Sequence, residues 1–333
     1  MNFQQRVDAL VHFAPKLGEL ADKEAILMQA SSQNAWFTKE EVKRSLNAWK
    51  GQLTRENILQ WLTPYAIPDK QMDSRTAIIM AGNIPLVGLH DLLCVLVCGG
   101  HALVKLSSED AVLMKKAIEL LIDSGFMGQI SISEERMPKD FTKVIATGSN
   151  NTNRYFEYYF KDKPSLLRRN RNSVAVLSGK ESPEDYLLLG SEIFAYFGLG
   201  CRSVSKLYVP EGFDFVPFFE GIEAYNPIFH HHKYANNYTY HKAIFLLNLT
   251  KHYDNGFLLV KQDERMASPL GCLFYQHYEN INGVEIDLKN RAEEVQCVVS
   301  SIQKEGWLPL GAAQQPELWD YADGVDTLTF LLS

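Results

Sequence analysis

The sequence predicts an α/β protein with a parallel, doubly wound sheet in a first domain and a second α/β domain after it. Three observations lead to this fold class. Short apolar runs of strand type alternate with longer runs of helical length from Arg75 onward. Turns of small residues, often with glycine, follow the strand-like runs. With 333 residues, the chain is long enough for two domains. Strand, turn and helix repeated at this spacing favour parallel strands covered on both faces.

We expect the first domain to span residues 1–190. It begins with a mostly helical, amphipathic lead-in that ends near residue 72. The expected strands are short and apolar, and they lie at 76–80, 102–105, 143–146 and 173–177. The expected helices start at capping residues or stop at glycine, and they lie at 86–97, 107–125, 150–160 and 182–197.

The second domain is expected over residues 191–333 and to contain a C-terminal return segment. Its pattern is mixed. Strands are expected at 205–209, 243–248, 256–260 and 271–275, and helices at 215–222 and 289–303.

Composition excludes several classes of protein. Apolar residues make up 46% and charged residues 22%, as in ordinary globular proteins. The net charge of −7 argues against binding to nucleic acid or to an anionic membrane, because both need a basic face. No apolar run reaches membrane-spanning length and no apolar signal segment follows Met1, so we expect a cytoplasmic protein without membrane insertion.

The five cysteines are odd in number and suggest no disulfide framework, which predicts reduced thiols. Cys94 and Cys98 lie four residues apart in an apolar run of helical length. This spacing places both on one buried face, and it predicts core packing rather than metal binding.

In a parallel sheet, ligands bind beyond the carboxyl ends of the strands. Four turns of the sequence fit that position, and they are Ala81-Gly82-Asn83, Leu106-Ser107-Ser108, Thr147-Gly148-Ser149 and Ser178-Gly179-Lys180.

Two segments carry the residue types of thiol-based acyl chemistry. Cys201 ends the run Gly198-Leu199-Gly200-Cys201, between a helical stretch and a strand-like one, and Asn83 stands in the turn after the first strand. A cysteine supplies a nucleophile, and a side-chain amide supplies an oxyanion donor. The alternatives are that Cys201 is a small buried residue and that Asn83 only satisfies the geometry of its turn.

Three further groups are candidates for binding an anion. Lys105 ends a strand and precedes Ser107 and Ser108 at an expected helix start; its alternative is a solvated strand end. The small-residue turn Thr147-Gly148-Ser149 precedes another expected helix and is weak evidence by itself. No Gly-x-Gly-x-x-Gly fingerprint and no phosphate-binding Gly-Lys-Ser/Thr loop occurs in the chain.

The basic cluster of Arg168, Arg169 and Arg171 could hold the phosphates of an adenine nucleotide or of coenzyme A, and its alternative is a solvated surface run. The consecutive histidines 230–232, with His241 nearby, lack the accompanying cysteine or carboxylate pattern of a metal site. We therefore expect a loop or helix end there, and no metal.

Taken together, in this order and spacing, these segments resemble the aldehyde dehydrogenase superfamily. The run 83–86 is similar to its Asn-Phe-Pro turn, and 99–105 to its Gly-Asn-x-Val-x-x-Lys strand, whose lysine meets the cofactor ribose or its phosphate. The run 147–149 is similar to its Thr-Gly-Ser turn near the nicotinamide, and 198–201 to its Gly-Gln-x-Cys nucleophile segment. The resemblance is good over residues 75–215 and implies an aldehyde dehydrogenase-like fold, with a nucleotide-binding first domain and a catalytic second domain.

Two departures from the superfamily pattern narrow the resemblance. Its hydrolytic members carry Glu-Leu-Gly-Gly-Lys, in which the glutamate activates water, whereas this chain has Val176 at the glutamate position. Without that base, hydrolysis of a thioester should be slow. The acid that often holds the ribose hydroxyls of NAD falls at Ser108, which would not repel a 2′-phosphate. With the chain length and the segment 314–326, these departures make the chain most similar to the LuxC-type fatty acyl-CoA reductases.

This resemblance implies NADPH-dependent reduction of a fatty acyl-CoA thioester to an aldehyde, through a thioester on Cys201 with Asn83 as oxyanion donor. NADPH is the expected cofactor, NADH is the alternative, and coenzyme A is released. An acyl-CoA or another acyl thioester is the expected substrate, an acyl-transferring protein is an expected partner, and a homo-oligomer is the expected assembly. Two alternatives stay open, namely oxidation of an aldehyde to an acid and a catalytically inactive binding or scaffold subunit.

Overall fold

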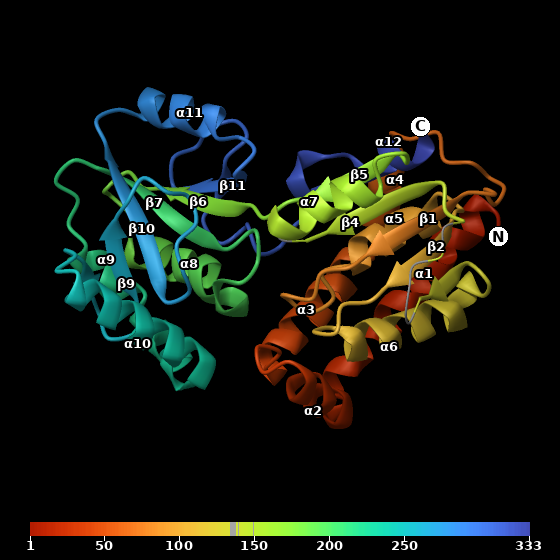
Figure 1. Cartoon of the computed structure of the whole chain (residues 1–333), viewed down its shortest axis with the longest axis horizontal. Helices are drawn as coiled ribbons and strands as arrows, with labels where there is room; N and C mark the ends of the chain where they lie inside the picture. Colours follow the sequence, from red (N-terminus) through yellow and green to blue (C-terminus); the bar gives the residue numbers. More distant parts are fainter. Residues whose placement is uncertain (134–137, 139, 149) are drawn as a thin grey trace. The chain divides into compact units, whose positions relative to one another are not determined.

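The computed structural model describes residues 1–133, 138, 140–148 and 150–333, and it divides into two compact units (Figure 1). Unit 1 comprises Met1–Asn170 and Glu317–Ser333, and unit 2 comprises Arg171–Pro316. The first crossing between the units thus comes earlier than the boundary expected at residue 190, and the C-terminal segment (317–333) belongs to unit 1.

The N-terminal part of unit 1 is helical, as the sequence predicts. Its helices are α1 (Phe3–Gly18), α2 (Glu24–Gln33), α3 (Lys39–Gln52) and α4 (Arg55–Leu62), with the short 3-10 turn η1 (Glu19–Asp22) after α1. Side chains of Asn2, Thr38 and Thr54 accept hydrogen bonds from backbone N–H groups in the first turns of α1, α3 and α4. These caps fix where the three helices begin.

The described residues of unit 1 form a five-stranded sheet in the order β3-β2-β1-β4-β5, and every pairing among these strands is parallel. The strands are β1 (Arg75–Ile79), β2 (His101–Lys105), β3 (Ile130–Ile132), β4 (Lys143–Thr147) and β5 (Ser165–Arg168). The connecting helical elements are α5 (Leu89–Val97), α6 (Ala111–Leu121), η2 (Ile122–Phe126) and α7 (Asn150–Tyr159), and the C-terminal segment adds η5 (Ala322–Gly324) and α12 (Thr327–Leu332).

The core of unit 1 packs the N-terminal helices, α5 and α6 against the sheet. Cys94 and Cys98 are buried in it, as the sequence predicts, and Leu318 and Leu328 of the C-terminal segment belong to the same core. Strands β3 and β5 are short and were not expected from the sequence.

Unit 2 contains a seven-stranded sheet in the order β12-β11-β6-β7-β10-β9-β8, parallel except for the β8–β9 pair. The strands are β6 (Asn172–Val176), β7 (Val204–Pro210), β8 (Tyr253–Asp254), β9 (Leu259–Gln262), β10 (Cys272–Tyr278), β11 (Val295–Ser300) and β12 (Leu308–Pro309). The helical elements are α8 (Pro183–Phe194), η3 (Ala195–Gly198), α9 (Val216–Gly221), η4 (Glu223–His230), α10 (His232–Leu247) and α11 (Ile281–Asn290).

Three expectations for the elements of unit 2 are wrong. The fourth expected strand forms β6 and pairs with β7 and β11, so it belongs to this second sheet and not to the first. The strand expected at 243–248 is the end of α10, and the helix expected at 289–303 contains the end of α11 and all of β11. Short apolar runs do not distinguish a strand from a helix end, and the sheet partners decide.

Among the described residues, no helix combines the length and the apolar character needed to cross a bilayer.

Candidate functional site

The carboxyl ends of three parallel strands lie at one edge of the unit 1 sheet. The register pairs Ile79 of β1 with Lys105 of β2 on one side and with Ala146 of β4 on the other. The turns that follow β1, β2 and β4 therefore leave the sheet at the same edge, as expected. The fourth expected turn, Ser178-Gly179-Lys180, follows β6 and belongs to unit 2.

The turn that carries Asn83 is fixed by two contacts from other elements. Asp110 Oδ2 accepts a hydrogen bond from the Leu86 backbone N–H at 2.7 Å, and Ser45 Oγ donates to the Pro85 carbonyl at 2.8 Å. Leu86 has a left-handed φ of 60°, a strained conformation for a branched side chain. Asn83 itself is exposed. The structure thus holds the backbone of this turn while the amide lies at the surface.

The Asn83 turn and the Ser107 turn are in contact. A Cβ atom at Gly82 would lie 2.5 Å from Ser107 Oγ, so this close approach needs glycine. Ser107 Oγ accepts a hydrogen bond from the Glu109 N–H, and Ser108 is exposed.

Helix α6 begins at Ala111, which corrects the expectation that Ser107 and Ser108 open it. The two serines lie in the loop before the helix. Asp110 is the residue that precedes α6, but its carboxyl does not cap the helix because it accepts from Leu86 instead. Burial raises the pKa of Asp110 well above its ordinary value, and the Leu86 N–H partly opposes that effect.

Lys105 ends β2 and is partly exposed, and its carbonyl accepts a hydrogen bond from the Met80 N–H at 3.0 Å. Thr147 ends β4, and Gly148 follows it. The buried Asn153 of α7 fixes this turn, since its Nδ2 donates to the carbonyls of Gly148 and Arg168. Ser149, also expected at the site, lies outside the described residues.

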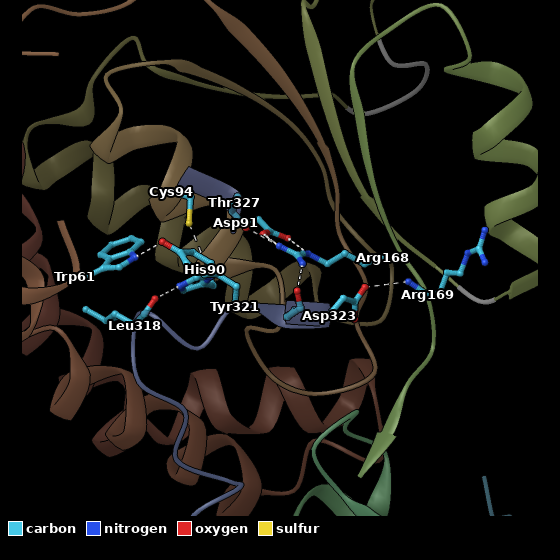
Figure 2. Close-up of polar contacts among 11 residues, drawn as sticks. Trp61, His90, Asp91, Cys94, Arg168, Arg169, Leu318, Tyr321, Asp323 and Thr327 are labelled. Carbon is cyan, nitrogen blue, oxygen red and sulfur yellow. Dashed lines mark hydrogen bonds and ion pairs between the residues drawn. The ribbon is translucent and has the colours of Figure 1, made fainter. Parts of the chain in front are cut away.

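The three arginines of the basic cluster lie in different settings. Arg168 is buried; its guanidinium donates to both oxygens of Asp91, at 2.7 and 3.2 Å, and to Thr327 Oγ1 and the Ala322 carbonyl (Figure 2). This is a correction to the expected phosphate contact. The donors of Arg168 hold the C-terminal segment, and burial removes the side chain from any anion in solvent.

Arg169 and Arg171 make contacts that differ from those of Arg168. The exposed guanidinium of Arg169 donates to Glu157 at 2.8 Å. Arg171 belongs to unit 2, where its Nη1 donates to the carbonyls of Ala292 and Val295. The cluster is therefore contiguous in sequence but divided between two units.

In unit 2, Cys201 lies in a turn (residues 196–203, the cysteine turn) with an unusual backbone. Tyr196, Phe197 and Gly198 have left-handed φ values of 51°, 59° and 79°. Two successive aromatic residues in this conformation are strained, and such strain persists only where surrounding contacts impose it. Both aromatic side chains are buried, and the ring of Phe197 packs against His231 at a centroid distance of 4.3 Å.

Hydrogen bonds fix the backbone carbonyls of Cys201 and of the residues before and after it. Ser173 Oγ, on β6, donates to the Cys201 carbonyl at 3.1 Å. Gln314 Nε2 donates to the Arg202 carbonyl at 3.1 Å, and the Ser203 N–H donates to the Gly200 carbonyl at 3.0 Å. Cys201 is partly exposed, in contrast to the buried cysteines Cys94, Cys98 and Cys272. A partly exposed thiol on a rigid backbone suits a nucleophile.

No family model matches the sequence, and no curated protein matches it. Solved structures do match. AldA, an indole-3-acetaldehyde dehydrogenase of P. syringae described in complex with NAD+ and IAA, is 12% identical with a TM-score of 0.68, over 95% of this chain and 75% of that one. The aldehyde dehydrogenase KauB of Pseudomonas aeruginosa is 13% identical with a TM-score of 0.67, over 91% and 73%. An NADP-dependent enzyme of E. coli is 15% identical with a TM-score of 0.66, over 92% and 74%.

The chain has the aldehyde dehydrogenase fold. The structural agreement, given by the TM-scores, establishes this architecture, and the sequence predicted it correctly. The residues that could hold a dinucleotide on this fold are those at the carboxyl edge of the unit 1 sheet. A partly exposed lysine, Lys105, and the hydroxyls of Ser107 and Ser108 lie there, and Gly82 allows the two turns to approach closely. Cation and hydroxyl donors at the strand ends of a parallel sheet fit a dinucleotide.

Val176, which ends β6, is fully buried. The turn after it is closed by Glu181, whose carboxylate accepts from Ser178, from the Gly179 N–H and from Ser301 Oγ. That carboxylate is engaged in holding the turn.

The consecutive histidines lie at a helix junction, as predicted: η4 ends at His230, His231 caps α10, and His232 begins it. The part of the chain that the structure describes contains no group of three or more His, Cys, Asp or Glu side chains placed to hold a metal.

Sequence reasoning missed Asp110, Asn153 and Ser173, which support the Asn83 turn, the Thr147 turn and the cysteine turn, and Glu192, which accepts a hydrogen bond from Ala313. For Glu192 a signal existed: it stands three residues after Leu189 and before Ile193, on the apolar face of an expected helix. A carboxyl in such a position needs a specific partner. Asp110 and Ser173 gave no local signal because their partners are distant in sequence.

Proposed function

We propose that this chain is an NADPH-dependent acyl-CoA reductase that carries the acyl group as a thioester on Cys201. The observation that carries the proposal is the cysteine turn, in which a partly exposed thiol lies on a strained and hydrogen-bonded backbone. The aldehyde dehydrogenase fold supports an NAD(P)-dependent oxidoreductase. The sequence resemblance to LuxC-type enzymes supports the acyl-CoA substrate.

In the proposed reaction, the Cys201 sulfur attacks the thioester carbonyl. A carbon–sulfur bond to Cys201 forms, the bond to coenzyme A breaks, and coenzyme A leaves as a thiolate that takes up a proton. The Cys201 N–H and the Asn83 amide are the proposed donors to the oxyanion. Loss of one such donor costs roughly 3–4 kcal/mol of transition-state stabilisation.

The chemistry that a bound NADPH would supply is a hydride to the acyl carbon. The bond from that carbon to the Cys201 sulfur would then break, which would release the aldehyde and regenerate the Cys201 thiolate. The proposed contributions of this chain are to bind the cofactor through Lys105 and Ser107 and to leave space at Ser108 for a 2′-phosphate. Thr147 and Gly148 are proposed to line the nicotinamide side. Arg168 is excluded from the cofactor contacts because its guanidinium is buried against Asp91.

The absence of a carboxylate at Val176 favours reduction over hydrolysis. On the sequence resemblance, hydrolytic members of the superfamily carry their base at this position, and the buried Val176 cannot activate water, so hydrolysis of a thioester on Cys201 would be slow. Aldehyde oxidation is the second candidate function, since structures with this fold include named aldehyde dehydrogenases.

The test is NADPH oxidation with a series of acyl-CoAs of increasing chain length, with free coenzyme A and aldehyde measured together. We expect turnover by the wild type and none by Cys201→Ser, which preserves size. Thermal unfolding of both proteins with and without NADPH serves as the control for folding and cofactor binding. Turnover by Cys201→Ser would contradict the assignment of the nucleophile.

The turnover and unfolding measurements also distinguish reduction from aldehyde oxidation and from an inactive scaffold. Steady acid formation from aldehyde and NADP+, without coenzyme A, would replace the proposal with aldehyde oxidation. If neither NADPH nor NADH raises the unfolding temperature, an inactive scaffold becomes the better description, because a ligand at 100 times its Kd adds about 2.7 kcal/mol. A homo-oligomer, an acyl-transferring partner protein and a cytoplasmic location stay part of the proposal.

A further inference from the structure

Glu192 of α8 is a buried carboxyl that the proposed reaction does not use. Its side chain is fully buried, and Oε1 accepts a hydrogen bond from the Ala313 N–H at 2.7 Å. Its other oxygen, Oε2, is buried and has no hydrogen-bond partner among the described residues. Burial raises the pKa of Glu192 to about 7, and the N–H groups of Ala313 and Gly311 oppose that rise. A carboxyl held in this way is costly and calls for a role.

The loop at residues 311–314 connects Glu192 to the cysteine turn. Ala313, which donates to Glu192, is followed directly by Gln314, which donates from Nε2 to the Arg202 carbonyl. Ala313 is fully buried, so the loop is packed into the interior of unit 2 at this point. Glu192 therefore holds one end of a short connection whose other end holds the residue next to Cys201.

A second thiol links the charge of Glu192 to the cysteine turn. Ser173 Oγ donates to the Cys201 carbonyl and lies 3.0 Å from Cys297 Sγ, within hydrogen-bond distance. Burial raises the pKa of the Cys297 thiol. Glu192 and Cys201 act on that pKa in the same direction, and Arg202 in the opposite one.

Other charged side chains on the elements packed against α8 are either hydrogen-bonded to neighbouring side chains or exposed to solvent. Glu220 of α9 is exposed. Glu223 of η4 accepts from Asn226, and Lys206 of β7 donates to Gln276. The ionisable groups acting on the Cys297 thiol are Arg202, Glu192 and Cys201.

We propose that Glu192 is a positioning residue for Cys201: it fixes the 311–314 loop against the cysteine turn, and its ionisation changes the reactivity of the Cys297 thiol, which lies beside Ser173. The inference rests on the proposed role of Cys201 as the nucleophile. The effect of the hydrogen bond between Glu192 and Ala313 can be separated from the effect of the Glu192 charge. Glu192→Gln keeps an oxygen acceptor for the Ala313 N–H but does not titrate.

The experiment measures alkylation of Cys201 and Cys297 by iodoacetamide between pH 5.5 and 9, with each site followed by peptide mass spectrometry. The proteins are the wild type, Glu192→Gln, Glu192→Ala and Gln314→Ala. Glu184→Gln, an exposed acid on the same helix, is the matched control. We expect an inflection near pH 7 in the Cys297 profiles of the wild type, Glu184→Gln and Gln314→Ala, and its loss in Glu192→Gln. An inflection that persists in Glu192→Gln would overturn the role of the charge.

The loop contact is tested by steady-state kinetics with acyl-CoA. Glu192→Ala and Gln314→Ala should each lower kcat at least about tenfold with little change in KM for NADPH, and Glu192→Gln should restore most of kcat at pH 6. Wild-type kcat in both alanine variants would overturn the positioning role. If Glu192→Ala does not fold, Gln314→Ala and Glu192→Gln still decide the question. An alkylation profile that behaves as expected without any reductase activity would support the inference and reject the proposed function.

Discussion

Ser108 is the residue at which the choice between NADPH and NADH is proposed to be made. It is exposed in the loop between β2 and α6, where a larger side chain can be introduced without disturbing the core. On the resemblance to aldehyde dehydrogenases, an acid at this position would hold the ribose hydroxyls of NADH and repel a 2′-phosphate.

We therefore predict that Ser108→Glu lowers the ratio of kcat/KM for NADPH to that for NADH by at least about tenfold, since about 1.4 kcal/mol of repulsion gives that factor. Steady-state kinetics with both cofactors checks this. Ser108→Gln, of similar size and without charge, is the control and should change the ratio much less. An unchanged ratio in Ser108→Glu would mean that the phosphate is bound elsewhere.

Glu192 should also make stability depend on pH. Its pKa rises from an ordinary 4.5 to about 7 in the folded protein, so the unfolded chain ionises first as pH increases. Between those two values the folded state binds more protons, and the free energy of unfolding falls with rising pH. The folded state therefore carries no cost from the Glu192 charge below about pH 4.5 and the full cost above about pH 7.

The expected loss is about 3 kcal/mol between pH 4.5 and 7, because each pKa unit corresponds to about 1.4 kcal/mol. Urea unfolding across this range should show the loss in the wild type and a flatter dependence in Glu192→Gln. Parallel curves for the two proteins would contradict the folded-state pKa.

At the scale of elements, the C-terminal segment is held on unit 1 by polar contacts that surround α5. His90 Nε2 lies 2.9 Å from the Leu318 carbonyl, and Trp61 Nε1 donates to the Tyr321 hydroxyl at 2.8 Å. Figure 2 shows these contacts beside the pair of Arg168 and Asp91. The ion pair joins the end of β5 to α5. The other N–H groups of Arg168 donate to Ala322 and Thr327 in the C-terminal segment.

We predict that Asp91→Ala destabilises unit 1 by about 3–5 kcal/mol, because it leaves the Arg168 guanidinium buried without its carboxylate. Glu157→Ala is the matched control, since it removes the exposed pair with Arg169 and should cost at most about 1 kcal/mol. Urea unfolding followed by tryptophan fluorescence measures both. Equal costs for the two variants would show that the buried pair does not hold the segment.

At the scale of the whole molecule, the chain crosses between the two units twice, after Asn170 and after Pro316. The sequence predicted two domains but placed the first boundary near residue 190, where an apolar helical run leads to the glycine-bounded cysteine. The actual division depends on the pairing of β6 with β7 and β11. Strand pairing of this kind joins distant segments, so no local pattern reports it.

Much of unit 1 and the candidate nucleophile could be predicted from sequence. Three local signals, namely the spacing of apolar residues, the helix caps and the positions of glycines, act over a few residues. They predicted the helical lead-in, the strands β1, β2 and β4, and the burial of Cys94 and Cys98. The position of Cys201 between a helix and a strand was predicted in the same way, from residue types and spacing, whereas the left-handed backbone at Tyr196 and Phe197 was not.

Only the tertiary structure decided the roles of the charged residues. Arg168 looked like a phosphate ligand beside two other arginines, but its carboxylate partner lies 77 residues away in sequence. Glu192 looked like one acid in a helix, but its partner lies 121 residues away. The sequence by itself determined the elements and the residue types at their ends. Which charges are buried, and against what, depended on long-range packing, because desolvation and pairing are properties of the folded surroundings.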